Sequence, residues 1–337
     1  MRRRAPIDAG GVDLPKVSSA MRPRWRRARW RAAAAGAVAV VVAMLSLGLG
    51  MAAAATGSGD AEDGTVRLFG PTSLWNTDKR PTQFAEAADP VLSQRPYCMN
   101  NDMFSRPVFF AAATDPTWTV TSGAGWGKPA RTVQFQAPAN IRPASGTDAV
   151  LNVLAPDGTL WDAYGATNLD PVARTFSAAF LVESDGIDGT GFGVQPYTPS
   201  GTTAVGAPQA GGVITAGDVA DRRIDHAATM AFDYNDEGGA STGAGPQVPP
   251  AVSNDDGGGP GPIPQGALLV ATGKMPSGLN TMERALWAAA KRKGVFVTDR
   301  LVGAPCFSGD GSRAVGKAFT GKGLTKIGRR LRLVKTW

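Results

Sequence analysis

The chain contains a single histidine, His226, within the segment Arg-Arg-Ile-Asp-His-Ala at residues 222–227. An imidazole titrates near neutral pH, so it is suited to act as a general acid or base. A strand over residues 224–232 would place His226 on the face opposite to Asp225. We therefore expect either a catalytic histidine at the floor of a cleft or a core histidine held by one hydrogen bond.

A second candidate segment, Leu-Trp-Asp-Ala-Tyr at residues 160–164, follows a turn at Asp157-Gly158. On a strand, Asp162 and Tyr164 lie on one face and Trp161 lies on the other. A Trp beside a carboxylate is typical of sugar-binding sites, because the ring stacks on the sugar and the acid accepts its hydroxyl groups. The alternative is a Trp that packs under a loop at the edge of a sheet.

Acidic and amide residues alternate over residues 233–237 as they do in calcium loops, and Gly238 follows at the sixth position. The twelfth position is Ala244, where an EF-hand requires Glu, so an EF-hand is excluded. A looser calcium site at Asp255 and Asp256 stays open. One His and two Cys in the whole chain exclude a four-cysteine or histidine-rich zinc centre.

Other common catalytic motifs are missing. The chain has no G-x-S-x-G segment for a serine nucleophile and no phosphate-binding or dinucleotide fingerprint. A glycosidase with paired carboxylates is still possible, because Asp162, Asp225 and Asp255 could approach one another in the fold.

Short apolar runs separated by turn residues predict a mainly β domain over residues 65–310, of the sandwich or jelly-roll type. One or two helices interrupt it, because Thr215 and Asn280 each begin a capping-box pattern. Residues 238–262 are rich in Gly and Pro and predict a flexible loop. The expected strands are Val108–Ala112, Trp118–Thr121, Thr132–Ala137, Ala149–Leu154, Thr175–Glu183 and Gly266–Thr272, with a further strand in Val-Phe-Val-Thr-Asp-Arg-Leu at residues 295–301.

The N-terminal region predicts export. Residues 1–31 form a basic tail with a net charge of +8, and residues 32–55 are uncharged. A bilayer core needs about 20 such residues, so residues 32–55 form either a transmembrane anchor or a cleaved signal segment. The positive-inside rule leaves the basic tail cytoplasmic. Beyond a spacer at residues 56–64, the domain is then outside the cytoplasm, either on the cell membrane as a single-pass protein or secreted.

The two cysteines fit an exported domain. Cys98 and Cys306 both lie in the exported part, where a disulfide can form and persist. A bridge between them would close a large loop and constrain the unfolded chain. The alternative is a pair of unrelated thiols.

Charge is concentrated at the two ends of the chain. The whole sequence has a net charge of +7, and residues 313–337 contribute +8 with no acidic residue. The part between the two basic ends is acidic, which disfavours nucleic acid as a partner. Residues 311–337 predict either a solvated basic tail, a strand with one basic face, or a segment that folds back onto the acidic domain. The partners we expect are the membrane and a cell-wall or other acidic polysaccharide.

Several segments, taken in order, resemble a broad group of uncharacterised exported bacterial proteins that share S-x-W-N, W-D and R-I-D-H-A segments. The resemblance implies a carbohydrate-directed jelly roll in which His226 and Asp162 line one cleft. It adds Trp75 and Asn76 as binding residues. Where these proteins have a further His ahead of the aspartate–aromatic segment, this chain has Asp148, which favours an inactive member. The matching segments are residues 72–77, 157–162, 211–214, 223–227, 250–257, 263–267 and 282–294.

Two functions follow as hypotheses. The first is an envelope enzyme that cleaves a polysaccharide by hydrolysis or β-elimination. In it, His226 and Asp162 are the acid–base pair, Tyr164 assists, and Trp161 or Trp75 stacks on the sugar. The second is a non-catalytic envelope protein that binds glycans through Asp225, Asp255 and the same cleft, or through the basic C-terminal segment.

Overall fold

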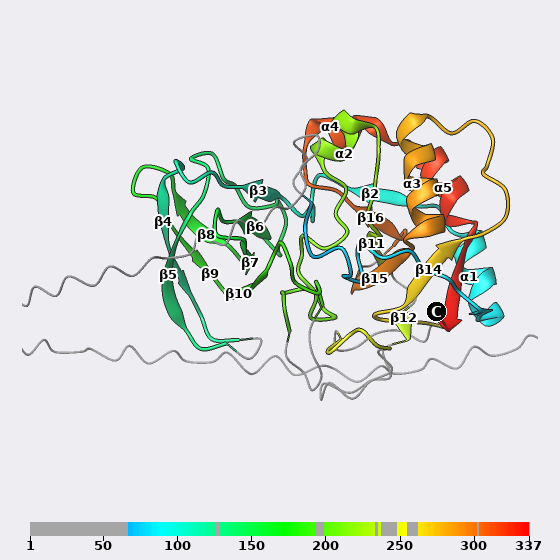
Figure 1. The fold of residues 1–337 in the computed structure, drawn as a ribbon, viewed down its shortest axis with the longest axis horizontal. Helices are drawn as coiled ribbons and strands as arrows, with labels where there is room; N and C mark the ends of the chain where they lie inside the picture. Colours follow the sequence, from blue (N-terminus) through cyan, green and yellow to red (C-terminus); the bar gives the residue numbers. More distant parts are fainter. Residues whose placement is uncertain are drawn as a thin grey trace, which may run out of the picture. The chain divides into compact units, whose positions relative to one another are not determined.

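Two four-stranded sheets and one seven-stranded sheet make up most of the regular structure (Figure 1). The computed structural model describes residues 67–125, 128–192, 199–232, 235–236, 248–254, 262–301 and 303–336. All of them belong to one unit, residues 57–337. The expected anchor at residues 32–55 lies outside the described residues. None of the helices in the described part of the chain is both long and apolar enough to cross a bilayer.

The first four-stranded sheet has the order β10-β7-β6-β3 and the second has the order β5-β4-β9-β8. Trp118 and Phe176 of the second sheet share one hydrophobic cluster with Leu151 and Leu181 of the first sheet. The strands are β3 (Val108–Phe110), β4 (Thr117–Ser122), β5 (Arg131–Gln136), β6 (Leu151–Leu154), β7 (Thr159–Tyr164), β8 (Thr167–Asp170), β9 (Thr175–Ala178) and β10 (Phe180–Asp185).

The expected strand over Thr175–Glu183 is divided between the two sheets. Residues up to Ala178 belong to β9, and residues from Phe180 belong to β10. Between them, the Ala179 N–H donates to the carbonyls of Tyr164 and Gly165. An unbroken apolar run cannot reveal such a crossing, because both halves have the composition of a buried strand.

The largest sheet is mixed, with the strand order β1-β17-β14-β15-β11-β16-β2. The pairs β11–β15 and β16–β2 are parallel, and the other pairs are antiparallel. Its strands are β1 (Gln83–Phe84), β2 (Cys98–Asn100), β11 (Ala228–Phe232), β14 (Leu268–Ala271), β15 (Val295–Arg300), β16 (Cys306–Ser308) and β17 (Leu331–Thr336), and a separate parallel pair joins β12 (Asn235–Asp236) to β13 (Ile263–Pro264).

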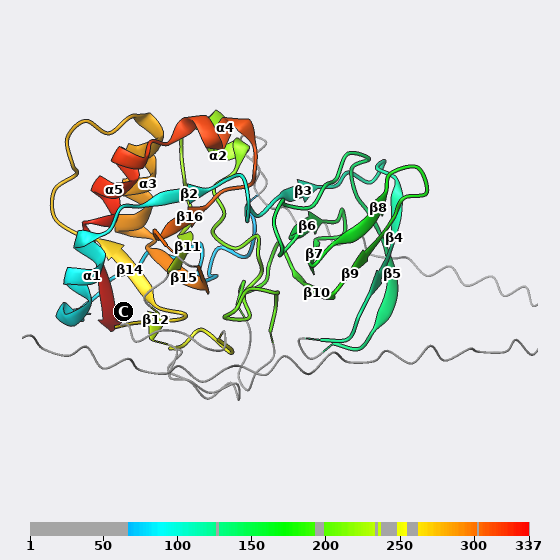
Figure 2. The ribbon, with the colours of Figure 1, turned by 180° about the vertical axis from the view of Figure 1, so that it is seen from behind.

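Helices pack on this large sheet (Figures 1 and 2). α3 contacts β14 and β11, α1 contacts β17, and α5 contacts both β2 and α3. Leu286 and Trp287 of α3 and Leu324 and Ile327 of α5 share a core cluster with Met230 of β11. The helices are α1 (Asp89–Gln94, preceded by a 3-10 turn at Glu86–Ala88), α2 (Ala216–Asp221), α3 (Thr281–Arg292), α4 (Arg313–Ala318) and α5 (Gly321–Gly328).

Both capping-box predictions are confirmed. The Thr215 side chain accepts from the Asp218 backbone and begins α2, and the Asn280 side chain accepts from the Glu283 backbone and begins α3. The mainly β character is also confirmed. The described residues nevertheless contain five α-helices rather than one or two. Most of these helices pack on the seven-stranded sheet. This sheet lies beside the two smaller sheets, and the sequence did not predict it.

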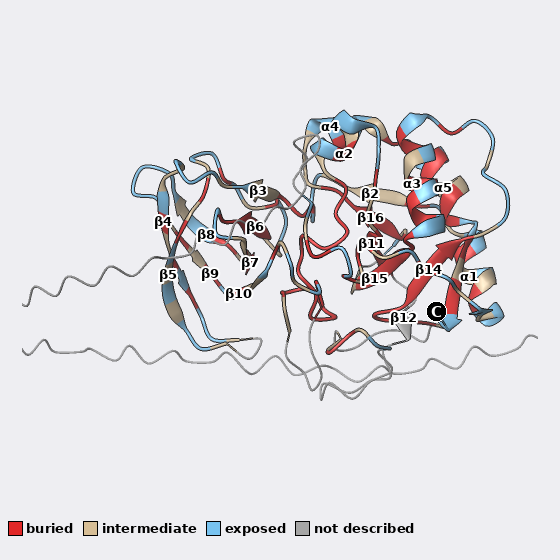
Figure 3. Cartoon of the chain, viewed as in Figure 1, coloured by how far each residue is buried: buried red, intermediate tan, exposed pale blue. Residues whose placement is uncertain are grey.

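The basic C-terminal segment belongs to the fold, which corrects the domain boundary at residue 311. Residues 313–328 form α4 and α5, and β17 pairs with β14 and β1 within the large sheet. Leu331 and Leu333 are buried, while Arg332 between them is partly exposed. Much of the large sheet is buried, whereas the helices around it are exposed on part of their surface (Figure 3). Of the alternatives for this segment, the strand is found, but its predicted basic face is not, because Val334 is buried and Arg332 is paired with Asp89.

Candidate functional site

A cavity of about 560 Å³ lies beside the disulfide, between residues of the large sheet and of the loops that lead into and out of the smaller sheets. Cys98 and Cys306 form part of its wall and are joined in a disulfide, as predicted. Ligand cavities commonly have volumes of about 300–1,000 Å³, so this one can hold a small molecule. The residues that line it are Cys98, Asn100, Phe104, Arg106, Asp148, Val150, Gln209, Ala231, Asp299, Arg300, Leu301, Ala304 and Cys306.

Arg106 supplies a buried charge to the cavity. It is 4% exposed, and it donates to Thr298 Oγ1 at 3.1 Å and to Asp299 Oδ2 at 3.2 Å. Burial lowers the pKa of the Arg106 guanidinium, and the charges of Asp299, Asp162 and Asp148 raise it again, in that order. A guanidinium stays protonated in proteins, so the cavity has a fixed cation balanced by carboxylates.

Gln209 supplies a neutral donor and acceptor. The residue is only 3% exposed, yet its side-chain amide lines the cavity and has no hydrogen bond within the described residues. A side-chain amide that has no protein partner can both donate to and accept from a molecule in the cavity. An amide in this position is therefore suited to a ligand with hydroxyl or carbonyl groups.

A buried loop positions Gln209. Residues 201–214 are all buried although they contain no helix or longer strand. Their backbone N–H groups need partners, since water cannot reach them. The carboxylate of Asp162 on β7 provides three contacts: its Oδ2 accepts from the N–H groups of Gln209 at 2.7 Å and Thr202 at 3.0 Å, and its Oδ1 accepts from Thr202 Oγ1 at 2.7 Å.

Asp162 is completely buried, and burial raises its pKa to about 6 against the opposing effect of its hydrogen bonds. It is absent from the residues that line the cavity. The carboxylate therefore fixes the loop that contains Gln209 and does not itself face a substrate. Tyr164, two residues further on, donates to Asp148 Oδ1 at 3.1 Å, and Asp148 lines the cavity.

His226 belongs to a different network. Its Nε2 lies 3.4 Å from the carboxylate of Asp218 in α2, and its Nδ1 lies 2.9 Å from the carbonyl of Ala227. The charge of Asp218 and the hydrogen bond to it raise the pKa of His226 despite burial, and the same partnership lowers the pKa of Asp218. Within the described residues, no hydrogen bond or ion pair joins His226 to Asp162. Neither residue of the predicted acid–base pair lines the cavity.

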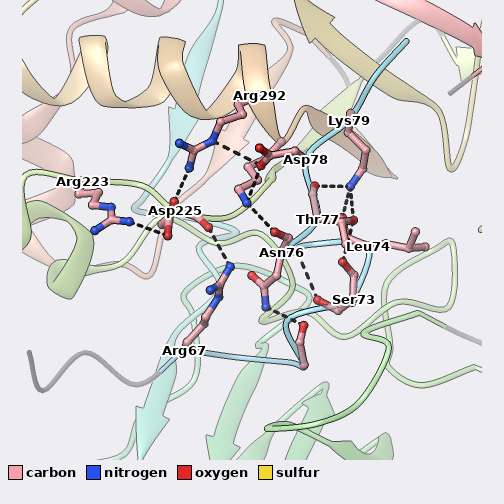
Figure 4. Close-up of polar contacts among 12 residues, drawn as sticks. Arg67, Ser73, Leu74, Asn76, Thr77, Asp78, Lys79, Arg223, Asp225 and Arg292 are labelled. Carbon is pink, nitrogen blue, oxygen red and sulfur yellow. Dashed lines mark hydrogen bonds and ion pairs between the residues drawn. The ribbon is translucent and has the colours of Figure 1, made fainter. Parts of the chain in front are cut away.

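His226 also lies outside the strand predicted for it. β11 begins at Ala228, and residues 224–227 form an irregular segment ahead of it. The opposite faces predicted for His226 and Asp225 depended on that strand. Asp225 forms ion pairs with Arg223 and Arg292 (Figure 4). The Asp225 backbone carbonyl accepts a further hydrogen bond from Arg67.

Asp225 is part of a structural ion network at the C-terminal end of α3 (Figure 4). Arg292 links Asp225 to Asp78, and the neighbouring Lys293 donates to Asp78 Oδ1 at 2.7 Å and to the Asn76 carbonyl at 2.5 Å. These contacts hold residues 67–79 against the end of the helix. The charges are already paired, so Asp225 is not a free ligand group.

Trp75 and Asn76 are structural as well. Trp75 is 1% exposed, donates to the Gly191 carbonyl at 2.7 Å and stacks on Phe192 with a centroid distance of 5.0 Å. The Asn76 side-chain amide donates to the carbonyls of Leu68, Phe69 and Gly70. A ring enclosed in this way cannot stack on a sugar, so the structure corrects the prediction for Trp75.

Trp161 lies on the face of β7 opposite to Leu160, as predicted, because the two side chains belong to different hydrophobic clusters. Its ring stacks on Phe135 with a centroid distance of 5.0 Å, and the Arg131 guanidinium lies over it at 5.6 Å. The ring packs within the smaller sheets and does not line the cavity.

No group of three or more acidic, His or Cys side chains is arranged to hold a metal ion within the described residues. Asp255 and Asp256, the possible calcium ligands, lie outside the described residues, as does most of the predicted loop at residues 238–262.

The residues that line the cavity were mostly missed from the sequence. Among them, the sequence singled out only Cys98, Cys306 and Asp148, and none of these as a residue of a ligand cavity. A signal did exist for Asp299: the apolar run Val-Phe-Val at residues 295–297 changes to Thr-Asp-Arg at its end, and polar residues at the end of a buried strand often face a site. Arg106 and Gln209 have no comparable local pattern.

Comparisons with protein-family models, with curated proteins and with solved structures find no match to this chain. The resemblance to exported bacterial proteins stays a prediction, and the candidate site is defined by its geometry alone.

Proposed function

We propose that this chain is a non-catalytic protein of the cell envelope that binds a sugar unit of a polysaccharide in the cavity beside the disulfide. The observation that carries the proposal is that Gln209 lines the cavity while its side-chain amide forms no hydrogen bond within the described residues. A sugar hydroxyl can both donate and accept, so it would satisfy this amide in either orientation.

The other cavity groups suit the same ligand. Asp148 accepts and Arg106 donates, and Asn100 adds a second amide. Phe104 is 40% exposed and offers an aromatic face at the same cavity. Planar polar side chains together with one ring match a sugar, which has hydroxyl groups at its edge and apolar C–H faces.

Binding is favoured over catalysis because the predicted acid–base pair has no access to this cavity. Asp162 is sealed behind the wall, and His226 is paired with Asp218. A general acid or base must reach the proton it transfers within about 3 Å or through one water. Neither group lines the cavity.

The proposed location in the cell envelope rests on the basic and apolar pattern of the N-terminal residues. This pattern is consistent with either an anchored or a secreted protein. The disulfide supports it, because such bonds persist outside reducing compartments. The two four-stranded sheets share one core, which supports the sandwich part of the predicted fold. The link from this fold to carbohydrate binding is an analogy, because one fold hosts many functions.

Calorimetry with the purified full chain in detergent tests the proposal, using a panel of neutral and uronic mono- and disaccharides. We expect at least one sugar to bind and Gln209→Ala to weaken that binding roughly tenfold, which is about 1.4 kcal/mol. Gln94→Ala changes an exposed glutamine on α1 and serves as the matched control. Equal affinity of wild type and Gln209→Ala, or no binding by any sugar, would overturn the proposal.

A parallel assay separates binding from catalysis. Incubation with polysaccharides should release neither reducing ends nor unsaturated products. Product release that disappears in His226→Ala would instead establish the enzyme hypothesis.

A further inference from the structure

Two adjoining depressions lie at the surface of α5 and share Lys326 and Arg329. Each has a volume of about 430 Å³. No acidic residue lines either of them, and no residue lines both a depression and the cavity beside the disulfide. The first is lined by Pro96, Tyr97, Gly321, Lys322, Thr325, Lys326 and Arg329, and the second by Ser93, Pro276, Ser277, Lys326, Arg329 and Arg330.

The cations of this surface lack counter-ions. The side chains of Lys322, Arg329 and Arg330 form no ion pair or hydrogen bond within the described part of the chain. Lys326 Nζ donates to the Ser277 carbonyl at 2.7 Å, which leaves its charge unneutralised. We call these four residues the basic face of α5.

The helix presents these charges together by its geometry. Lys322, Lys326 and Arg329 are spaced by four and three residues, so they lie on one side of α5. Leu324 and Ile327 on the other side are buried in the main core. The helix is held close to its neighbours, because a Cβ at Gly328 would come within 2.3 Å of the Tyr97 ring.

Such an arrangement costs stability in the free protein. Like charges at a spacing of four residues repel each other. Other cations of the domain are neutralised by carboxylates, as Arg106 is by Asp299 and Arg332 is by Asp89. A cluster of four cations without a carboxylate beside them indicates an anionic partner.

We propose that the basic face of α5 binds an acidic polysaccharide that lies along the two depressions. A linear polymer with a carboxylate on each sugar can place successive charges near Lys322, Lys326 and Arg329. The hydroxyls of Ser93 and Thr325, which line the depressions, can bind sugar hydroxyls between the charges. A linear polysaccharide can enter two adjoining depressions, whereas a flat bilayer surface cannot follow them.

This inference deepens the proposed function, because it gives the polysaccharide a second, charge-dependent contact. The test is binding of polygalacturonate to the full chain in detergent by biolayer interferometry, with neutral dextran as the uncharged probe. Measurements at about 0.1 M and about 1 M salt compare screening lengths of ~10 Å and ~3 Å. We expect binding of polygalacturonate only, with an affinity that falls strongly at the higher salt concentration.

A triple variant, Lys322→Gln with Arg329→Gln and Arg330→Gln, removes three charges of the basic face. We expect it to bind polygalacturonate at least about tenfold more weakly, since each such charge near an anionic surface contributes on the order of 1 kcal/mol. The control changes Arg80, Arg142 and Arg174 to Gln; all three are exposed, so the loss of net charge is the same. The control should bind as wild type does.

Three outcomes overturn the inference: unchanged affinity in the triple variant, an equal loss in the control variant, or salt-dependent binding to vesicles of phosphatidylcholine with phosphatidylglycerol in place of polygalacturonate. The triple variant should bind the mono- and disaccharides of the calorimetric panel as the wild type does, because no residue of the basic face lines the cavity beside the disulfide. Failure of the cavity proposal and failure of this one are therefore distinguishable.

Discussion

The carboxylate of Asp162 holds the backbone of Gln209, a residue that lines the cavity: its Oδ2 accepts from the Gln209 backbone N–H at 2.7 Å. One residue thus holds the backbone of the other from the protein interior. A side chain that resembles a catalytic acid in the sequence acts here as a positioning residue.

Replacing Asp162 tests this role. Asp162→Ala leaves the buried N–H groups of Thr202 and Gln209 without an acceptor, and we expect a loss of about 2–5 kcal/mol in the free energy of unfolding. Asp162→Asn keeps one oxygen for both N–H groups and should cost far less. Urea denaturation measures both, and equal losses would contradict the hydrogen-bonding role.

The pH dependence gives a second view of the same group. Burial raises the pKa of Asp162 from 3.8 to about 6, so its contribution to stability is complete below 3.8 and falls as the pH rises through about 6. In Asp162→Asn this decrease should be absent. If the stability of the wild type and of Asp162→Asn changes in parallel between pH 3.8 and about 6, Asp162 is not a buried carboxylate with a raised pKa.

The ion pair of His226 and Asp218 predicts a window of stability. The pKa of His226 is raised above 6.5, so its contribution is complete below 6.5 and is lost as the pH rises through the raised value. The pKa of Asp218 is lowered, so its contribution disappears as the pH falls through a value below 3.8. We expect His226→Gln to lower the free energy of unfolding most between the lowered pKa of Asp218 and the raised pKa of His226. In alkaline solution the difference in stability between wild type and variant should become smaller. Denaturation across a pH series checks this, and a constant difference would rule out the pair.

The disulfide should contribute to both stability and binding. Replacing Cys98 and Cys306 together by Ser is expected to cost about 2–5 kcal/mol, because the bridge joins residues 208 positions apart and restricts the unfolded chain. Since both residues line the cavity, sugar affinity should fall as well. Thermal unfolding with and without reductant provides the measurement; a reduced protein that unfolds at the same temperature would contradict it.

Trp75 offers a test of core packing against ligand stacking. Its ring packs between Phe69, Phe192 and Phe296, so Trp75→Ala is expected to cost about 3–5 kcal/mol. Trp75→Phe keeps part of the volume and should cost less. In the Phe variant, which stays folded, sugar affinity should match that of the wild type. A selective loss of affinity there would restore a binding role.

The C-terminal strand predicts the effect of a truncation. A chain ending at Gly328 lacks β17, which pairs with β14 and β1 and buries Leu331 and Leu333. We expect such a chain to be cleaved by protease far faster than the full chain, because β14 becomes an edge and core residues are exposed. A chain ending at Val334 serves as the milder control. If the full chain and both truncated chains are cleaved at the same rate, residues 329–337 form a solvated tail and do not contribute to the sheet.

Local signals in the sequence were sufficient for much of the secondary structure. The caps at Thr215 and Asn280 mark helix starts because their side chains bond to backbone groups only three residues away. The alternation in residues 160–164 predicted that Leu160 and Trp161 lie on opposite faces of a strand, and in the structure they belong to different hydrophobic clusters. Turn residues between apolar runs predicted most strands of the smaller sheets.

The cavity could not be predicted in the same way. Arg106 and Asp299 are 193 residues apart, and nothing near either one in the sequence indicates that they meet. The resemblance to other proteins selected Trp75 and His226, yet the structure buries the first in the core and pairs the second with Asp218. Residue type and order do not reveal whether a side chain packs inward or faces a cavity.

The sequence by itself determined the charge distribution, the mainly β character, the helix starts and the plausibility of one disulfide, because these depend on composition or on neighbours within a few residues. The tertiary structure alone decided that Asp162 holds a buried loop, that Gln209 is left without a partner, and that the basic end of the chain completes the large sheet. Those outcomes depend on which distant segments pack together, and therefore on burial and on hydrogen bonds between residues far apart along the chain.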